Sequence, residues 1–103
     1  MKLEEFTAEG LRPHVGSPFH VTLEDGRVFD LVLEEVSVVN EKHVSPRQNR
    51  DSFSLFFVGP ENVLMNQYTY SLTHDELGGP WSIFIVPIGR RANGAFQYEA
   101  AFT

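Results

Sequence analysis

WSIFIVPIG (residues 81–89) and SFSLFFVGP (residues 52–60) are the two longest apolar runs in a chain that otherwise alternates between apolar and polar residues. In an extended backbone Trp81 and Ile83 point to one side and Phe84 to the other, so both faces of the first run carry large side chains. A strand that is apolar on both faces is covered on both sides. The two runs are therefore predicted to be neighbouring central strands.

Shorter alternating runs flank these two strands. They predict four further strands, at residues 18–24, 27–39, 67–72 and 95–102. Asp25-Gly26 separates the first two, and this dipeptide favours a two-residue hairpin turn because both positions tolerate positive φ. In the long second run the apolar phase slips at Glu34-Glu35, which predicts a β-bulge that bends the strand.

Residues 3–15 are the one segment with a helical pattern. Phe6 and Leu11 can share an apolar face, while Gly10 and Pro13 limit the helix to about two turns. We expect this short helix to plug one end of the sheet.

These elements define the predicted fold. Hairpin-type spacing without a βαβ rhythm indicates antiparallel connections. A long strand with a bend favours a closing sheet over a flat one. The sequence therefore predicts a mainly β fold, a small antiparallel β-barrel or bent roll of about six strands with one short N-terminal helix, as a single domain over residues 1–103.

The composition excludes several classes of protein. The chain has 103 residues, the size of one domain, and no cysteine, which excludes disulfides, thiolate metal sites and a cysteine nucleophile. Fourteen acidic against eight basic residues give a formal charge of −6, which disfavours binding to a nucleic-acid backbone. The sequence shows neither a secretory leader nor a run of about 20 apolar residues, so we expect a cytoplasmic protein without membrane contact.

Five polar residues cluster at the end of the fourth predicted strand: Ser71, Thr73, His74, Asp75 and Glu76. If the cluster were catalytic, His74 would be a general base oriented by a carboxylate, with Ser71 as the nucleophile. If the cluster is structural, Thr73 caps a turn and His74 packs at the junction between the turn and the strand. Members of a catalytic triad converge from different elements, so we favour the turn and predict no catalytic residue.

The remaining titratable residues show no recognisable site. The four histidines have neither the H-x-H nor the H-x-x-x-H spacing of metal ligands, so we expect no metal and no other cofactor. A carboxylate pair for glycoside chemistry would have to come from acidic residues that the pattern places on polar strand faces. These are Asp30, Glu34, Glu35 and Glu99. We interpret them as solvated.

Aromatic residues of the fourth and fifth predicted strands are the first candidates for binding. Tyr68 and Tyr70, with Gln67 and Trp81, could line a ligand mouth, with His74 close by in sequence. A barrel of about six strands has little interior beyond its own side chains. For that reason we favour a place in the core for these aromatics.

Two loops carry basic residues that suit contact with a protein partner. The one long polar loop, residues 40–51, includes Arg47 and Arg50. The loop after the fifth predicted strand includes Arg90 and Arg91. Polar loops of this kind are either solvated or in contact with a partner.

Five segments, in order, carry a resemblance to a known family. They are FTAEGLRPHVGSPF (residues 6–19), FSLFFVGP (53–60), QYTYSLTHDELGG (67–79), FIVPIG (84–89) and YEAAF (98–102). On these segments the chain resembles a family of short bacterial proteins described as a domain of unknown function. The resemblance implies an association with phage-tail-like collar proteins, and it assigns no catalytic residue to this chain.

The expected function is that of a non-enzymatic structural or accessory protein acting through protein–protein contacts, in a phage-tail-like assembly as the resemblance implies. An exposed edge strand that pairs with a partner is the natural mode of contact. A homo-oligomer would form if residues 95–102 lay at a sheet edge. The alternative is a small-molecule-binding β-barrel or a minor hydrolase centred on His74, which requires His74, a tyrosine and a carboxylate to converge in a concave site.

Overall fold

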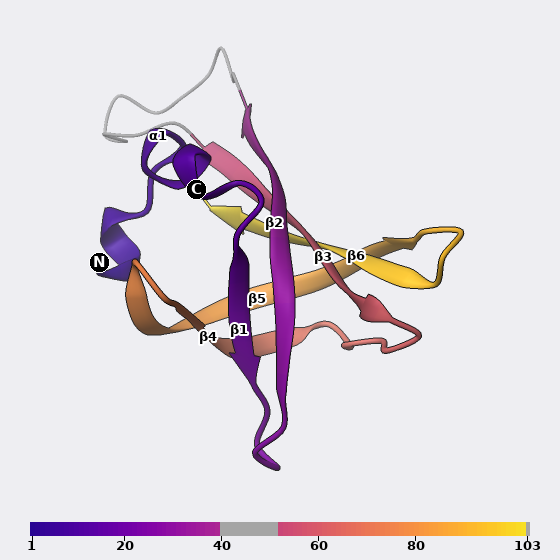
Figure 1. Cartoon of the computed structure of the whole chain (residues 1–103). Helices are drawn as coiled ribbons and strands as arrows, with labels where there is room; N and C mark the ends of the chain where they lie inside the picture. The colour runs from indigo at the N-terminus through magenta and orange to yellow at the C-terminus, as the bar shows by residue number, and fades with distance from the viewer. Residues whose placement is uncertain (40–51, 103) are drawn as a thin grey trace.

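The computed structural model describes residues 1–39 and 52–102 (Figure 1). The strands are β1 (Pro18–Thr22), β2 (Val28–Val39), β3 (Ser52–Glu61), β4 (Tyr68–His74), β5 (Gly78–Arg90) and β6 (Ala95–Phe102). Short helical pieces precede them: η1 (Leu3–Glu5), α1 (Ala8–Leu11) and η2 (Arg12–His14). Each of the predicted strands is present. No helix in the described ranges is long and apolar enough to cross a membrane.

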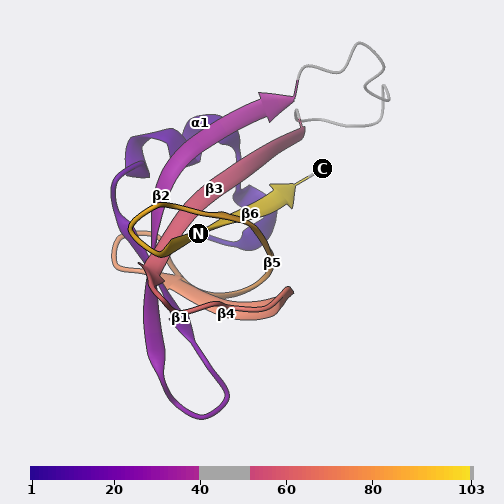
Figure 2. The same cartoon turned by 90° about the vertical axis from the view of Figure 1, so that its right-hand side faces the viewer.

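The strands close into a barrel in the order β1-β2-β3-β6-β5-β4, and each neighbouring pair is antiparallel. This confirms the predicted antiparallel β-barrel. Two views at right angles show the strands wrapping around a common interior, with the β1–β2 hairpin projecting beyond it (Figures 1 and 2). β6 pairs with both β3 and β5. The terminal strand is therefore not at a sheet edge, and the prediction that β3 and β5 are neighbours is wrong.

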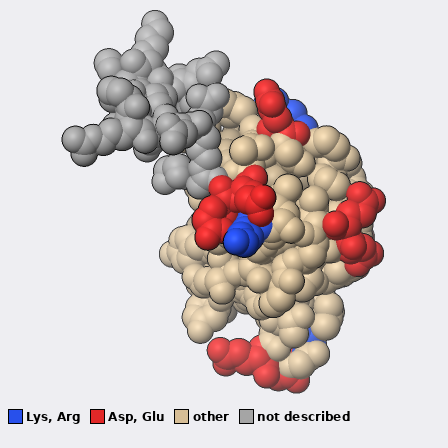
Figure 3. Space-filling model, turned by 90° about the vertical axis from the view of Figure 1, so that its left-hand side faces the viewer, with Lys and Arg blue, Asp and Glu red and all other residues tan. Residues whose placement is uncertain are grey.

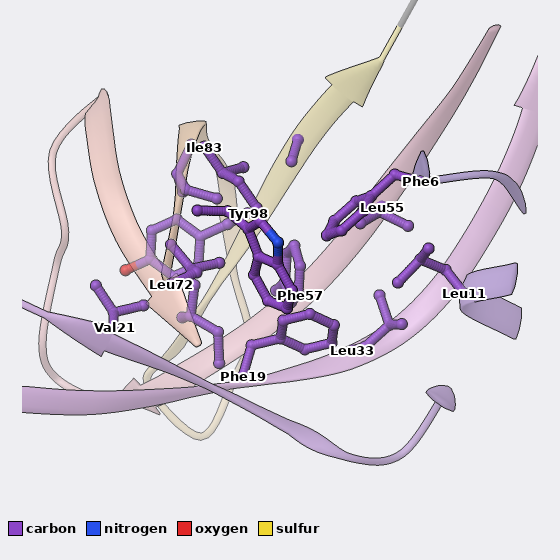
Figure 4. Close-up of a cluster of buried hydrophobic side chains, with 14 of the residues drawn as sticks. Phe6, Leu11, Phe19, Val21, Leu33, Leu55, Phe57, Leu72, Ile83 and Tyr98 are labelled. Atoms are coloured by element: carbon purple, nitrogen blue, oxygen red, sulfur yellow. The ribbon is translucent and has the colours of Figure 1, made fainter. Parts of the chain in front are cut away.

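The interior is filled by the inward side of each strand (Figure 4). Trp81, Ile83 and Ile85 of β5 are buried there, as the alternation predicts. Aromatic rings from β1, β3 and β6 fill the space between them, namely Phe19, Phe53, Phe57 and Tyr98. Phe84 points outward and is 52% exposed, so the prediction that both faces of this strand are covered is wrong. A closed barrel has one interior, and the second apolar face of β5 remains toward solvent.

A β-bulge lies within β2 at the predicted place. The pairing of β2 with β3 shifts register between Leu33 and Glu35. β2 pairs with β1 before this point and with β3 from Val32 onward. The bend lets one long strand serve two neighbours, as the phase slip in the sequence indicated.

The β1–β2 loop is one residue longer than predicted. The Leu23 N–H donates to the Arg27 carbonyl at 2.8 Å, which leaves three residues in the loop, and Gly26 has φ 89°. A type I turn followed by a left-handed glycine gives a loop of this length. Asp25-Gly26 is compatible with both loop lengths, so the dipeptide alone does not fix the register.

The N-terminal pieces close one end of the barrel (Figure 1). Phe6 and Leu11 are fully buried in the core, and the Phe6 ring meets the Trp81 ring edge to face with centroids 5.0 Å apart. Thr7 caps α1 by accepting a hydrogen bond from the Gly10 N–H at 3.0 Å. The predicted helix is therefore present as three short pieces, and its predicted role as a plug is confirmed.

Candidate functional site at the β1–β4 seam

The junction between β1 and β4 is the shortest in the barrel, and we call it the seam. Three residue pairs join the strands, from His20 opposite Thr73 to Thr22 opposite Ser71. Beyond Thr22 the chain leaves β4 and enters the projecting β1–β2 hairpin (Figure 1). Residues 68–70 therefore pair with β5, but in the described part of the chain they have no strand partner on the β1 side. We call this side of residues 68–70 the open edge.

A groove of about 490 Å³ lies between the open edge and the hairpin. Its lining residues are Thr22, Leu23, Glu24, Asp25 and Arg27 on the hairpin side, and Tyr68, Thr69, Tyr70, Ser71 and Ser82 on the other side. Tyr68, Tyr70 and Leu72 occupy alternate, inward-facing positions of β4. Leu72 is fully buried, Tyr70 is half-buried and Tyr68 is 56% exposed. The predicted core position is wrong for Tyr68, because β1 diverges before it can cover that ring.

The two tyrosine rings form a preorganised aromatic surface in the groove. They meet edge to face, with centroids 5.6 Å apart and planes at 70°. The Tyr70 hydroxyl donates to the Asn66 carbonyl at 2.6 Å, which fixes its ring. Burial raises the pKa of Tyr70 above its ordinary value of 10.0. The hydroxyl therefore stays protonated near neutral pH and acts as a hydrogen-bonding group.

The hairpin side of the groove carries net negative charge. The Arg27 backbone N–H and Nε donate to the Asp25 carboxylate at 3.0 and 2.6 Å. The backbone hydrogen bond, followed by the guanidinium, lowers the pKa of Asp25. Glu24 has no ion-pair partner among the described residues, so one carboxylate is left over. Figure 3 shows a similar imbalance over one face, where acidic side chains lie in several separate groups and basic ones are few.

His74 is buried near the seam and has both ring nitrogens engaged. Nδ1 accepts from the backbone N–H groups of Glu76 and Leu77 at 3.1 and 3.2 Å. Nε2 lies 2.8 Å from Ser17 Oγ, and the Ser17 hydroxyl donates to the His14 carbonyl at 2.5 Å. Since Nδ1 accepts and the Ser17 proton is used elsewhere, Nε2 carries the single ring proton and the imidazole is neutral. Burial, followed by repulsion from His14, lowers the pKa of His74.

This geometry makes His74 a turn residue. Its side chain, and not that of Thr73 as predicted, caps the turn after β4. His74 is 5% exposed and does not line the groove that contains Tyr68 and Tyr70. In residues 1–39 and 52–102, His74 therefore does not meet a tyrosine and a carboxylate in one concave site, which is what the hydrolase alternative requires.

We expect the stability of the protein to fall as the pH decreases below His74's ordinary pKa of 6.5. The unfolded chain has that ordinary pKa and the folded protein a lower one, so below pH 6.5 the unfolded state binds more protons. The free energy of unfolding should decrease until the pH reaches the folded pKa. Urea denaturation between about pH 5 and pH 8 measures this trend. The His74→Gln variant keeps an acceptor oxygen but cannot titrate, and an unchanged pH dependence in it would contradict the prediction.

Arg90 and Arg91, two of the basic residues predicted to contact a partner, do not line the groove. Arg90 lies over the Phe96 ring, with its guanidinium carbon 5.2 Å from the ring centroid. Arg91 forms an ion pair with Glu34. Both are thus engaged at the surface, away from the tyrosines. Two further predicted residues, Arg47 and Arg50, lie outside the described residues.

Sequence reasoning missed His20, which bridges two carboxylates at the seam. Its Nδ1 lies 2.7 Å from Asp30 Oδ1 and its Nε2 2.9 Å from Asp75 Oδ1. These hydrogen bonds, with Asp30 contributing more than Asp75, raise the pKa of His20 above 6.5. The three-residue loop places His20 opposite Asp30, whereas the predicted two-residue turn would place it opposite Leu31. Asp75 comes from a distant turn and gives no local signal.

The histidines and carboxylates near the seam do not form a metal site. Within the described ranges, no group of three or more potential ligands is arranged to hold a metal ion. The nitrogens of His20 face carboxylates, and those of His74 face Ser17 and the backbone. These ring nitrogens, which would have to bind a metal ion, are engaged in hydrogen bonds within the protein.

The comparison with protein families agrees with the sequence pattern. The model of a family described as a domain of unknown function (DUF6916) matches residues 6–102, nearly the whole chain. The chain belongs to this family. No curated protein matches the chain, and no solved structure does. Membership of the family confirms the resemblance but assigns no chemistry, so a functional proposal has to rest on the groove and the seam.

Proposed function

We propose that this domain is a non-enzymatic protein-interaction module that binds an extended segment of a partner protein by strand addition at the open edge. The observation that carries the proposal is the divergence of β1 from β4, which leaves residues 68–70 paired on one side only within the described part of the chain. Alternate residues of such an edge direct their backbone N–H and C=O groups outward. These groups form a template for one further strand.

The groove supplies side-chain contacts for an added strand. A strand in a sheet lies about 4.8 Å from its neighbour and directs successive side chains to opposite faces. One set of partner side chains would meet the rings of Tyr68 and Tyr70, which supports an apolar or aromatic residue at alternate positions. The other set would lie beside Thr69 and Ser71, where small or polar residues fit.

Charge narrows the chemistry of the partner further. Asp25 is neutralised by Arg27, and Glu24 is the carboxylate left over on the hairpin side. A lysine or arginine in the bound segment would face it. We therefore propose an extended segment with at least one basic residue and an apolar residue two positions away. Binding of such a segment weakens with added salt, because an exposed pair is screened.

The packed interior favours this proposal over a ligand held inside the barrel. Phe19, Phe57 and Tyr98 are almost fully buried and occupy the central space. A small molecule would have to bind in the groove instead, and it would not form the series of backbone hydrogen bonds that an unpaired strand edge offers. The wider setting, an accessory role in a phage-tail-like assembly, rests on the family resemblance alone and is proposed on that basis.

A displayed library of random linear peptides, selected against the purified protein, tests the proposal. We expect binders whose addition shifts the amide signals of residues 68–70 in an NMR spectrum of the labelled protein. Tyr68→Ala should weaken the best binder about tenfold, or about 1.4 kcal/mol, because it removes half of the aromatic surface. Fluorescence anisotropy with the labelled peptide measures the affinity.

Phe84→Ala is the matched control. Phe84 is an aromatic residue of similar exposure on the neighbouring strand, but it points to the outer face and does not line the groove. It should change the affinity by less than about twofold, as expected for a residue outside the binding surface. A selection that yields no binder, or binders equally sensitive to both variants, would show that the open edge is not the binding site.

A further inference from the structure

The side chain of His20 connects the two sides of the seam in addition to the backbone pairing of its strands. It belongs to the first of the three residue pairs that join β1 to β4. Its ring reaches Asp30 on β2 at 2.7 Å and Asp75 in the turn after β4 at 2.9 Å. One side chain thus connects the hairpin to the turn across the seam. No other junction in the described barrel is as short, and this bridge adds a side-chain connection to the three residue pairs that join β1 to β4.

The bridge requires a protonated imidazole. A carboxylate oxygen accepts hydrogen bonds and a neutral imidazole has only one N–H. Both nitrogens of His20 face carboxylate oxygens, so a neutral ring would turn a lone pair toward one of them. The contact with Asp30 is the shorter one and joins residues already paired in the β1–β2 ladder. On deprotonation the contact with Asp75, which crosses the seam, is therefore the one that is lost.

We propose that His20 is a proton-operated latch that keeps the seam closed when protonated and lets β1 separate from β4 when it loses its proton. Separation would extend the open edge from residues 68–70 into residues 71–73, because these are the seam residues of β4. Thr22 and Ser71 already line the end of the groove, so the groove would lengthen at that end. The claim that the latch controls binding in the groove rests on the function proposed above, whereas pH-dependent closure of the seam does not.

The charged and titratable groups around His20 favour its protonated form, and therefore a seam that is closed at lower pH. Asp30 of β2 and Asp75 of the turn attract the imidazolium, and together they raise the pKa of His20. His74 of β4 is the other titratable ring packed nearby, and it is neutral in its hydrogen-bonding state. Glu76, next in the turn, faces His14 at 3.9 Å instead of His20. The folded pKa of His20 is above 6.5, so the stabilisation is complete below pH 6.5 and is lost as the pH rises through the folded pKa.

Hydrogen exchange of the seam amides tests the latch without any ligand. The protection factors of residues 20–22 and 71–73, corrected for the intrinsic effect of pH, are compared at about pH 6 and pH 8.5. Loss of an exposed charge-assisted contact should lower them about twofold to fivefold at the higher pH. Amides of the β3–β6 ladder, which the latch does not touch, should keep their protection. Seam protection that does not change with pH would overturn the proposal.

Two neighbouring carboxylates provide the variant and its control. Asp75→Asn should remove the pH dependence, because an amide can either accept from His20 Nε2 or donate to it. Glu76→Gln changes an equally exposed carboxylate in the same turn that faces His14, and it should keep the full pH dependence. Both side chains are more than three-quarters exposed, so neither change should prevent folding. Equal behaviour of the two variants would overturn the latch.

A peptide selected at the open edge separates this inference from the proposed function. If the latch controls the groove, the peptide should bind about twofold to fivefold more tightly at pH 8.5 than at pH 6, and only Asp75→Asn should abolish the difference. Binding that does not depend on pH would overturn the control of the groove. Absence of any peptide together with pH-dependent seam exchange would instead overturn the proposed function and leave the latch in place.

Discussion

Gly79→Ala is expected to lower the free energy of unfolding by about 3 kcal/mol. Gly79 has φ 99°, a region in which a residue with a Cβ atom is strained. The added Cβ would lie 2.8 Å from the Leu72 carbonyl oxygen and 3.2 Å from Thr73 Cα. Both atoms belong to the backbone of β4, which cannot retreat without disturbing its pairing with β5 or the seam. Urea denaturation of the variant measures the loss.

Gly78→Ala is the control that separates the cost of positive φ from the cost of the steric clash at Gly79. Gly78 precedes Gly79 and has φ 95°, but its added Cβ would have nothing within 4 Å. The variant should therefore lose only the conformational contribution, about 1 to 2 kcal/mol. Equal losses in the two variants would mean that β4 shifts easily at this point. The seam would then be softer than its packing indicates.

This pair of glycines shows how the turn positions the seam. The turn between β4 and β5 carries Asp75, which His20 reaches, and it follows His74, whose ring caps it. The absence of a Cβ atom at Gly79 lets the turn lie close against β4. A variant that displaces the turn would therefore also displace one of the two carboxylates of the latch.

Local sequence pattern was sufficient for the strands. Apolar patterning, as alternation in four strands and as longer apolar runs in β3 and β5, predicted all of the strands in the described residues, and the phase slip at Glu34-Glu35 located the bulge in β2. Both are consequences of the two-residue period of an extended chain, which a single sequence contains in full. The buried inner face of β5 followed in the same way.

Closure of the barrel could not be read from any one segment. The placement of β6 between β3 and β5 depends on its pairing with β3, which joins residues far apart along the chain, such as Phe57 and Tyr98. The exposure of Phe84 follows from closure, because no second layer among the described residues covers the outer face of its strand. An apolar run shows that the side chains are hydrophobic, but it does not show whether another part of the protein buries them.

The candidate site was predictable only in part. Tyr68 and Tyr70 were identified as possible lining residues, but their exposure depends on where β1 stops pairing with β4. The role of His20 depends on a loop of three residues instead of two, a difference of one position in register. The cap formed by His74 in place of Thr73 depends on burial of the ring. The first fact depends on pairing between distant segments, the second on the exact length of one loop, and the third on packing of the His74 ring against Phe19 and Ser17.

Tyr98→Phe is expected to lower the free energy of unfolding by about 2 kcal/mol although the ring itself is retained. Tyr98 is fully buried, and its hydroxyl accepts from the Met65 N–H at 2.9 Å and donates to the Val63 carbonyl at 3.3 Å. Met65 is also buried, so loss of the hydroxyl leaves its N–H without a partner and without access to water. An unsatisfied buried donor is worth about 1–3 kcal/mol. Urea denaturation at a pH near neutrality gives the difference.

Tyr70→Phe is the control that decides what the Tyr98 result means. The Tyr70 hydroxyl also donates to a backbone carbonyl, that of Asn66, but this contact is exposed and water can replace it. Its removal should lower the free energy of unfolding by less than about 0.5 kcal/mol. The hydroxyl of Tyr98 reaches from β6 through the interior to the chain that leads into β4. If Tyr98→Phe has no greater effect than Tyr70→Phe, that chain is not held from the interior, and the position of the open edge must be set by the pairing of β4 with β1 and β5.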